Sequence, residues 1–299
     1  MTAGVAVTGG QEASLRQLEL LIIRRLDGLL HGDYHGLLLA AGSEPGEARE
    51  YRWGDDVRHM DWNLTARTTV AHVRDTIADR ELETWLVIDR TASMDFGTVR
   101  CEKRDLALTA AAAFTLLTNR AGNRTGAVVV GGSKCRVVPA QTGRDPSMAL
   151  LHRLATEERA GDGAGPSLAD GLLQADRIGR RRGLIVVVSD FLDGSDWPRL
   201  LRRLGRRHQV VAVEVRDPRE DSLPAVGLLT LVDPESGQRV EVQTSNPKLR
   251  ARFADAAASR RASVGASLRA SGAHHVVLST DRDWILDLLS AVERWRRLR

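Results

Sequence analysis

The alternation of apolar strands with helical segments is the feature that most limits how this chain can fold. From residue 83 onward, short runs rich in Val, Ile and Leu recur between longer segments of helical pattern: TWLVI, TGAVVVGG, GLIVVVSD, QVVAVEV and HHVVLST. Continuous apolar runs are typical of strands buried on both faces, and their alternation with helices predicts a mostly parallel sheet covered on both sides. The expected class is therefore α/β, with a doubly wound sheet over residues 83–299.

Two segments depart from this alternation. KCRVVPA follows TGAVVVGG after a short turn and predicts an antiparallel hairpin at an edge of the sheet, and GLLTLVDPESGQRVEVQT predicts a second, inserted hairpin. The remaining segments have helical spacing. Helices are expected at about 100–121, 146–158, 168–179 and 247–270, and in the stretches WPRLLRRLGRR and DWILDLLSAVERWRRL.

The first third of the chain differs in character. Residues 14–39 carry leucines and isoleucines at helical spacing, which predicts an N-terminal helical segment within residues 1–45. Residues 46–82 are polar and rich in turns, with short alternating stretches such as TTVAHVRD, so we expect a small strand-containing extension packed on the core. Its Trp53 and Trp62 either anchor an interface or close the core against the sheet.

Composition and the lack of long apolar runs indicate in which compartment the protein lies. Apolar residues make up 42% and charged residues 27% of the chain, no apolar run approaches the ~20 residues of a membrane-spanning helix, and the N-terminus has no signal-peptide pattern. We therefore expect a cytoplasmic protein without membrane insertion, with Cys101 and Cys135 as reduced thiols. The net charge is +4, and nearly all of the basic charge is arginine. Five arginines cluster in residues 199–207, on the solvated side of the predicted helix WPRLLRRLGRR. We expect no nucleic-acid binding.

Acidic and hydroxyl side chains follow two of the predicted strands. TWLVI runs directly into Asp89, with Thr91 and Ser93 at alternate positions, and LIVVVS runs into Asp190. Alternate residues of an extended chain point the same way, and ligands of doubly wound sheets bind outside the carboxyl ends of the strands. An oxygen-only set of this kind suits Mg²⁺, with Mn²⁺ or Ca²⁺ as alternatives.

Ser167 is a candidate for one further hydroxyl ligand. It lies in the glycine-rich stretch GDGAGPSLADGL, directly before a predicted helix, and could approach the metal from the flank. Taken alone, a serine at this position is more often a helix N-cap.

These residues carry a resemblance. Asp89-Arg90-Thr91-Ala92-Ser93 resembles the D-x-S/T-x-S metal-ion-dependent adhesion site of von Willebrand factor A domains, with Ser167 and Asp190 at the positions of the loop threonine and the acid after the fourth strand. The resemblance implies that Asp89, Thr91, Ser93, Ser167 and Asp190 hold a divalent cation directly or through water.

A second resemblance narrows the family. The stretch EAREYRWGDDVRHMDWNLTAR, Glu47 to Arg67, is similar to the signature of the bacterial family named domain of unknown function 58, in which it precedes a von Willebrand factor A-like fold. That family is associated with MoxR-type AAA+ ATPases, so the resemblance implies a protein-binding module that partners such an ATPase or its client. No catalytic reaction is implied.

Two alternatives stay open. In a metal-dependent hydrolase of phosphate esters or nucleotides, the same cation would activate water. Against this, the DRTAS loop holds no second acid, His or Cys to serve as base or nucleophile, and the chain has no phosphate-binding G-x-x-x-x-G-K-[ST] loop. The other is nucleic-acid binding by the arginine-rich helix, which the absence of zinc-finger spacing and of an aromatic-rich strand motif disfavours. The Asp55–Asp56 pair is interpreted as a turn that pairs with nearby arginines, and His274 and His275 as structural residues that begin a strand.

Overall fold

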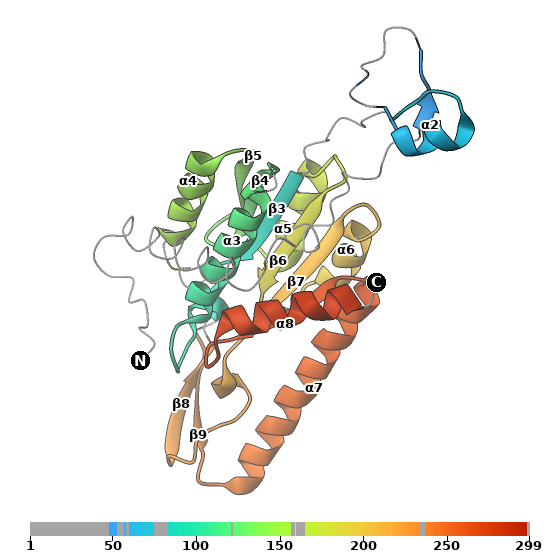
Figure 1. The fold of residues 1–299 in the computed structure, drawn as a ribbon. Coiled ribbons are helices and arrows are strands. Elements are labelled where there is room, and N and C mark those ends of the chain that lie inside the picture. Colours follow the sequence, from blue (N-terminus) through green and yellow to red (C-terminus); the bar gives the residue numbers. More distant parts are fainter. Residues whose placement is uncertain are drawn as a thin grey trace.

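The computed structural model describes residues 48–52, 57, 60–74, 83–120, 122–156, 159, 165–233 and 237–297. In these residues, a central sheet lies between two layers of helices (Figure 1). The predicted helical segment within residues 1–45, together with Trp53 and the Asp55–Asp56 pair, lies outside the described residues.

The central sheet has six strands, and their order along the sheet is β10-β7-β6-β3-β4-β5. All neighbours are parallel except β5, which pairs antiparallel with β4 at the edge. The predicted α/β class, the mostly parallel sheet and the antiparallel edge strand are therefore confirmed. The bounds are Glu83–Asp89 for β3, Arg124–Val130 for β4, Arg136–Gln141 for β5, Leu184–Ser189 for β6, Gln209–Arg216 for β7 and His274–Ser279 for β10.

This strand order puts a topological switch point between β3 and β6. From β3 the chain continues to β4 and β5 on one side, and then returns to β6, β7 and β10 on the other. At a switch point the connections that leave two adjacent parallel strands run in opposite directions, which opens a crevice outside their carboxyl ends. The carboxyl ends of β3 and β6 are the ends that carry Asp89 and Asp190.

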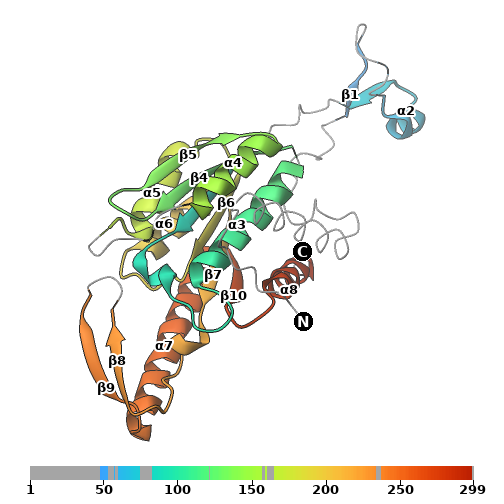
Figure 2. The ribbon, with the colours of Figure 1, turned by 90° about the vertical axis from the view of Figure 1, so that its left-hand side faces the viewer.

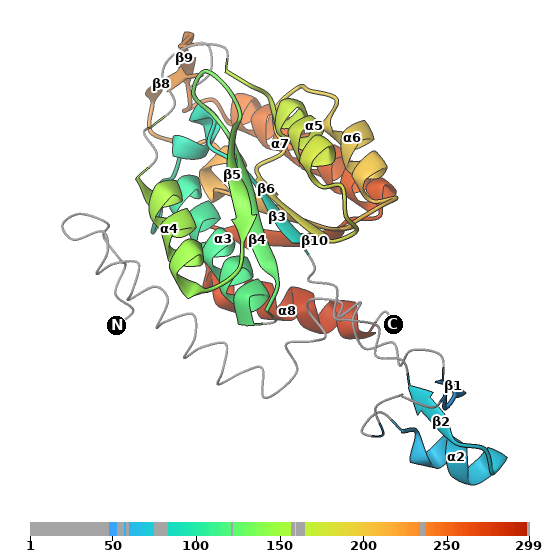
Figure 3. The same ribbon diagram turned by 90° about the horizontal axis from the view of Figure 1, so that it is seen from above.

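The two faces of the sheet are covered by different helices. Figure 3 shows α3, α4 and α8 on one face and α5, α6 and α7 on the other. Because successive strand residues point to opposite faces, Leu86 and Ile88 join the core under α3, while Trp85 and Val87 join the core under α5. The bounds are Lys103–Arg120 for α3, Arg144–Ala155 for α4, Leu168–Ile178 for α5, Trp197–Leu204 for α6, Pro247–Ser271 for α7 and Trp284–Arg297 for α8.

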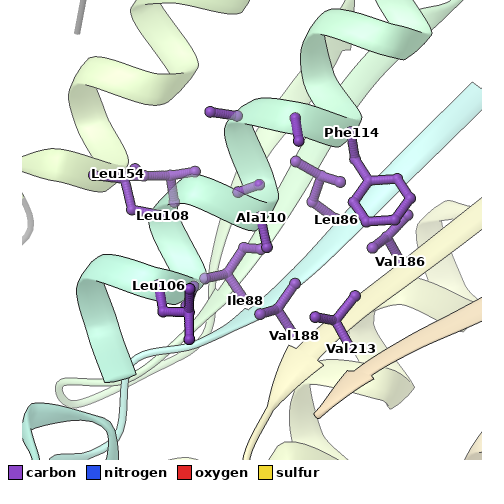
Figure 4. Close-up of a cluster of buried hydrophobic side chains, with 14 of the residues drawn as sticks. Leu86, Ile88, Leu106, Leu108, Ala110, Phe114, Leu154, Val186, Val188 and Val213 are labelled. Atoms are coloured by element: carbon purple, nitrogen blue, oxygen red, sulfur yellow. The ribbon is translucent and has the colours of Figure 1, made fainter. Parts of the chain in front are cut away.

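Helix α3 lies close to the sheet because alanines form much of its inner face. Ala110, Ala111 and Ala113 are almost fully buried, and Phe114 fills the remaining space against the strands (Figure 4). Leu86 and Ile88 of β3 pack in the same cluster. Truncation of such a buried leucine to alanine costs about 2–5 kcal/mol, so this cluster fixes the position of β3 and of the acid at its end.

The predicted inserted hairpin is confirmed as β8 Leu228–Val232 and β9 Arg239–Gln243, an antiparallel pair that follows the short helix η4 Pro218–Glu220. Together with the first turns of α7 it extends away from the main sheet (Figure 2). Its base is held by Thr244, whose hydroxyl donates to the carbonyl of Gly227 at 2.7 Å and accepts the amide of Val226 at 3.1 Å.

The described part of residues 46–82 forms a small unit of its own. Strand β1 Ala48–Glu50 pairs antiparallel with β2 His72–Arg74, and α2 Trp62–Thr68 begins at Asp61, whose side chain accepts the amides of residues 63 and 64. Trp62 is 67% exposed, so it does not close a core among the described residues. The packing of residues 46–82 on the sheet stays a prediction, because the connection from Arg74 to Glu83 lies outside the described residues.

Across the described residues, no helix is both long enough and apolar enough to cross a lipid bilayer. Cys101 and Cys135 are free, half-buried thiols, and burial raises the pKa of both, to about 11 for Cys101.

Candidate metal site at the carboxyl edge of the sheet

The turn after β3 brings three of the expected site residues together. Asp89 ends the strand and is 2% exposed, and its Oδ1 accepts the Thr91 amide at 2.9 Å and the Thr91 hydroxyl at 2.7 Å. The Thr91 and Ser93 hydroxyl oxygens lie 3.2 Å apart. The chain then continues as a short 3-10 helix, η3 Ala92–Asp95. Asp89, Thr91 and Ser93 therefore form one oxygen cluster, as their alternate spacing predicts.

The end of β6 joins this cluster through its last residue. Ser189 donates its hydroxyl proton to Asp89 Oδ2 at 2.6 Å, and the same hydroxyl oxygen accepts the amide of Phe191 at 2.9 Å. Phe191 has a φ of 57°, an uncommon conformation for a bulky residue, and its ring packs against Trp197 at 5.0 Å. The chain thus turns sharply at Asp190, and β3 and β6 are joined at the switch point.

Asp190 lies at this switch point but has partners of its own. Its Oδ2 is 2.7 Å from the Nζ of Lys103, and its Oδ1 accepts the amide of Leu192 at 3.1 Å. The Lys103 ammonium also contacts Glu220 Oε1 at 2.5 Å. Lys103 is fully buried and Asp190 is 3% exposed, so this ion pair lies inside the protein.

The electrostatics distinguish the groups of the site. Burial, together with repulsion by Asp190, raises the pKa of Asp89 to about 6, against the opposing hydrogen bonds from Ser189 and Thr91. Burial alone would lower the pKa of Lys103, but Asp190 and Glu220 outweigh it and hold that pKa above its usual value. The pKa of Glu220 is also raised, mainly by burial. Asp89 is thus a carboxylate that a nearby positive charge would stabilise.

The hydroxyl protons in the cluster are all directed inward. Thr91 and Ser189 each donate their hydroxyl proton to Asp89. In the hydrogen bond between Thr91 and Ser93, Ser93 is therefore the donor. What remains available are lone pairs: one on Asp89 Oδ2, one on Thr91 and two on Ser93. An anionic oxygen set that offers only lone pairs fits a hard divalent cation. Asp89, Thr91 and Ser93 would hold the ion, and Asp190 adds negative charge beside them.

The hydroxyl of Ser167 makes its hydrogen bonds within α5 and not with the oxygen cluster. Its hydroxyl donates to Asp170 Oδ2 at 2.7 Å and accepts the Asp170 amide at 3.3 Å, so Ser167 is the N-cap of α5 in a capping box. The first turn of α5 also meets the loop after β6, where Asp193 accepts the Leu168 amide at 2.9 Å. No hydrogen bond joins the hydroxyl of Ser167 to the other four expected ligands, and its role as a ligand stays a prediction.

Two residues of the site were missed by the sequence interpretation. Ser189 is the one polar residue in the apolar run LIVVVS, and a polar residue at the end of a buried strand is a usable signal. Lys103 is one of only three lysines in an arginine-rich chain and is followed by an alanine-rich, buried helix. Its two carboxylate partners lie 87 and 117 residues away along the chain, a distance that spacing alone cannot bridge.

The local chemistry is limited in the described part of the chain. No group of three or more His, Cys, Asp or Glu side chains is arranged there to hold a metal ion. The candidate site therefore depends on hydroxyl oxygens as much as on carboxylates. The predicted structural role of His275 agrees with its contact in β10, where Nε2 lies 2.7 Å from the buried carboxylate of Glu214.

Several solved structures resemble this fold at low sequence identity. A conserved hypothetical protein BatB from Bacteroides thetaiotaomicron gives a TM-score of 0.46 at 13% identity, covering 72% of this chain and 99% of that one. The SpRpn10 VWA domain gives a TM-score of 0.38 at 15% identity, covering 70% and 93%.

Sequence comparison gives nearer relatives. An uncharacterized protein of Mycobacterium bovis and one of Mycobacterium tuberculosis are each 51% identical over 285 residues, which is 95% of this chain and 90% of theirs. An uncharacterized protein of Mycobacterium avium is 43% identical over 160 residues, 54% of this chain and 94% of its own. The family described as "Protein of unknown function DUF58" matches residues 47–263, and the chain belongs to this family.

Proposed function

We propose that this protein is a metal-dependent protein-binding module. In this proposal Asp89, Thr91 and Ser93 hold one Mg²⁺, or Mn²⁺ or Ca²⁺ in its place, with Asp190 and Ser167 contributing directly or through water. A carboxylate of a partner protein completes the coordination of the ion. The protein works by holding its partner and has no turnover of its own.

The observation that carries the proposal is the oxygen cluster of Asp89, Thr91 and Ser93 at the end of β3. Thr91, Ser93 and Ser189 all donate within the cluster, so the free side of the cluster presents lone pairs beside the carboxylate of Asp89. The charge of Asp89 is unfavourable in this arrangement, because burial, together with repulsion by Asp190, raises the pKa of Asp89 to about 6. A bound divalent cation relieves this repulsion.

The chain's own residues hold and orient the site. Ser189 fixes one oxygen of Asp89 and Thr91 the other, so that the carboxylate cannot rotate. Arg104 ties the end of η3 to α3 through Asp95 at 2.7 Å, which fixes the loop that carries Ser93. When bound, the cation would supply an electrophilic point at which a partner's carboxylate oxygen displaces water.

The surface beside the site favours an acidic partner. An open depression of about 610 Å³ follows η3 and is lined by residues 97–102 and by Arg104, Asp105, Ala155 and Arg159. Three of these lining residues are arginines against two acids, but Arg104 is paired with Asp95 and Arg159 with Glu102, so the excess of positive charge is small. The net charge of the whole chain is also positive, at +4. Complementary charge speeds encounter and selects partners.

The identity of the partner rests on the family resemblance and not on the geometry. We assign the partner as a MoxR-type AAA+ ATPase or that ATPase's client, in the cytoplasm. The residues supply only the mode of contact, which is a carboxylate docked on a metal ion. A metal-dependent phosphate-ester or nucleotide hydrolase is the alternative, and activity that survives purification and is lost in Asp89→Ala would replace the binding function with it.

Calorimetric titration with Mg²⁺, Mn²⁺ and Ca²⁺ tests the site. We expect weak 1:1 binding by the wild type and none by Asp89→Ala, with the far-ultraviolet circular dichroism unchanged. Asp255→Ala, which removes an exposed aspartate on α7, is the matched control and should bind as the wild type does. Equal affinity in Asp89→Ala would refute the site.

A pull-down from lysate tests the docking step. Wild type and Asp89→Ala are each used with and without chelator. We expect a set of partners that is recovered only by the wild type without chelator. Recovery of the same partners under all four conditions would show that the metal site is not the contact.

A further inference from the structure

Lys103 is the most unusual charged residue of the described structure. Its side chain is 0% exposed, and its ammonium lies 2.7 Å from Asp190 and 2.5 Å from Glu220. Burial of an ammonium is costly unless the charge is paired and hydrogen-bonded. Here two carboxylates supply both, and one of them belongs to the candidate metal site.

The loop between η3 and α3 brings Lys103 close to the oxygen cluster. The Lys103 amide donates to the carbonyl of Phe96 at 2.8 Å, so the first residue of α3 lies directly beside the end of η3. The intervening loop is tightly folded, since a Cβ on Gly97 would lie 2.4 Å from the carbonyl oxygen of Cys101. Glycine at position 97 therefore permits the close approach that brings the ammonium to the switch point.

The contacts of Asp190 show what the ammonium does there. Oδ2 of Asp190 is bound to Lys103 and Oδ1 to the amide of Leu192, so both oxygens have partners within the chain. Asp89, by contrast, has no cationic partner among its hydrogen bonds, which come from Thr91 and Ser189. Asp190 is thus partly compensated by a lysine that it shares with Glu220, and Asp89 is left for an external cation.

We infer that Lys103 is a built-in cation that positions Asp190 and limits how tightly the site binds a divalent ion. This inference rests on the proposed function. With Lys103 in place, its single positive charge offsets part of the charge of Asp190 and Glu220, so a divalent ion at Asp89 lies beside less negative charge and attracts a partner's carboxylate more strongly. Without Lys103, Asp190 and Glu220 would be uncompensated, so the ion would bind more tightly and attract the partner less.

The test uses substitutions that change the charge at Asp190 in opposite directions. Lys103→Met removes the ammonium at similar length, and Lys103→Gln removes the charge but keeps hydrogen-bond donors for both carboxylates. Glu220→Gln removes the competing carboxylate, so the ammonium is left to Asp190 alone. Lys134→Met, at an exposed lysine between β4 and β5, is the matched control.

Mn²⁺ titration, with thermal unfolding in chelator and in Mg²⁺, provides the readouts. We expect about tenfold tighter Mn²⁺ binding in Lys103→Met and Lys103→Gln, because a positive charge near the ion has been removed. Glu220→Gln should bind more weakly than the wild type, and Lys134→Met should match it. In chelator Lys103→Met should unfold several degrees below the wild type, and Mg²⁺ should restore more of its stability than it adds to the wild type.

The outcomes separate this inference from the proposed function. Wild-type affinity retained or lowered in both Lys103 variants overturns the role of Lys103 and leaves the metal site standing. Absence of binding in the wild type and all variants overturns both. Binding that appears only in the Lys103 variants supports Lys103 as the built-in cation and overturns the metal-dependent function of the wild type. If Lys103→Met does not fold, Lys103→Gln and Glu220→Gln decide in the same way.

Discussion

Two buried aspartates at the same edge of the sheet have opposite environments. Asp217 follows β7, is 0% exposed, and accepts four hydrogen bonds: from the Thr98 amide and hydroxyl at 2.9 and 2.8 Å, the Arg219 amide at 2.8 Å and the Thr280 hydroxyl at 2.7 Å. Burial would raise the pKa of Asp217, but these donors outweigh it and hold the pKa below its usual value. Asp89 has only three donors, and burial, together with a second acid nearby, raises its pKa to about 6.

The difference separates a structural carboxylate from a candidate functional one. The four donors of Asp217 come from three separate segments, the loop after η3, the start of η4 and the end of β10, so this side chain ties the edge together. The charge of Asp217 is satisfied by the fold itself. The charge of Asp89 is not fully compensated by the fold. A buried carboxylate of this kind at a switch point is a candidate for ligand binding.

The largest expected effect comes from Asp217→Asn. The amide nitrogen would place donors opposite donors, and a buried N–H or O–H of Thr98, Arg219 or Thr280 would lose its acceptor. We expect a loss of about 3 kcal/mol in the free energy of unfolding, because each unsatisfied buried group costs about 1–3 kcal/mol. Urea denaturation in chelator measures it, and Mn²⁺ affinity should stay within about twofold of the wild type. A loss below about 1 kcal/mol would contradict the structural role.

The same change at Asp89 should have the opposite sign. Asp89 is almost fully buried, and a pKa rise of about two units means that ionisation opposes folding by up to about 3 kcal/mol at neutral pH. Asp89→Asn removes that cost, but its amide nitrogen cannot accept the proton of the Ser189 hydroxyl, so the gain is only partial. We therefore expect an increase of about 1–2 kcal/mol in unfolding free energy at pH 7 in chelator, together with complete loss of Mn²⁺ binding.

The pH dependence of stability tests independently whether ionisation of Asp89 opposes folding. The folded pKa of Asp89 lies above the unfolded value of 3.8, so between about pH 4 and pH 6 the unfolded state releases its proton first. The stability of the wild type should therefore fall relative to that of Asp89→Asn as the pH rises through this range, and the difference should be constant above it. Parallel stability curves for the two proteins would show that Asp89 is not strained.

Much of the sheet edge could be predicted from the sequence because its signals are local. An apolar strand that ends in an acid, followed by hydroxyls at alternate positions, fixes the relation of Asp89, Thr91 and Ser93 within one turn. Strand alternation then places Asp190 at the same edge, since parallel strands end together. The helical spacing predicts α3 at about 100–121, and both ends lie within three residues of the observed Lys103–Arg120.

What could not be predicted depends on contacts between distant segments. Lys103 and Glu220 meet at 2.5 Å although they are 117 residues apart, and Asp217 finds Thr98 from 119 residues away. No periodicity reports such pairs. Ser167 could not be assigned to one role for a different reason. A serine directly before a helix is expected both for an N-cap and for a ligand that approaches from the flank, so its position does not distinguish the two roles.

The smallest effect distinguishes these two roles of Ser167. Replacement of a capping serine by glycine costs only a few tenths of a kcal/mol, whereas alanine costs about 1 kcal/mol. Ser167→Gly therefore nearly preserves α5 while removing the hydroxyl. If Ser167 supplies a ligand as proposed, Ser167→Gly should bind Mn²⁺ severalfold more weakly with almost unchanged thermal stability, and Ser167→Ala should lose affinity and stability together. Unchanged Mn²⁺ affinity in both variants would assign the hydroxyl of Ser167 to the helix cap alone, and the site would then consist of residues from the β3 and β6 ends.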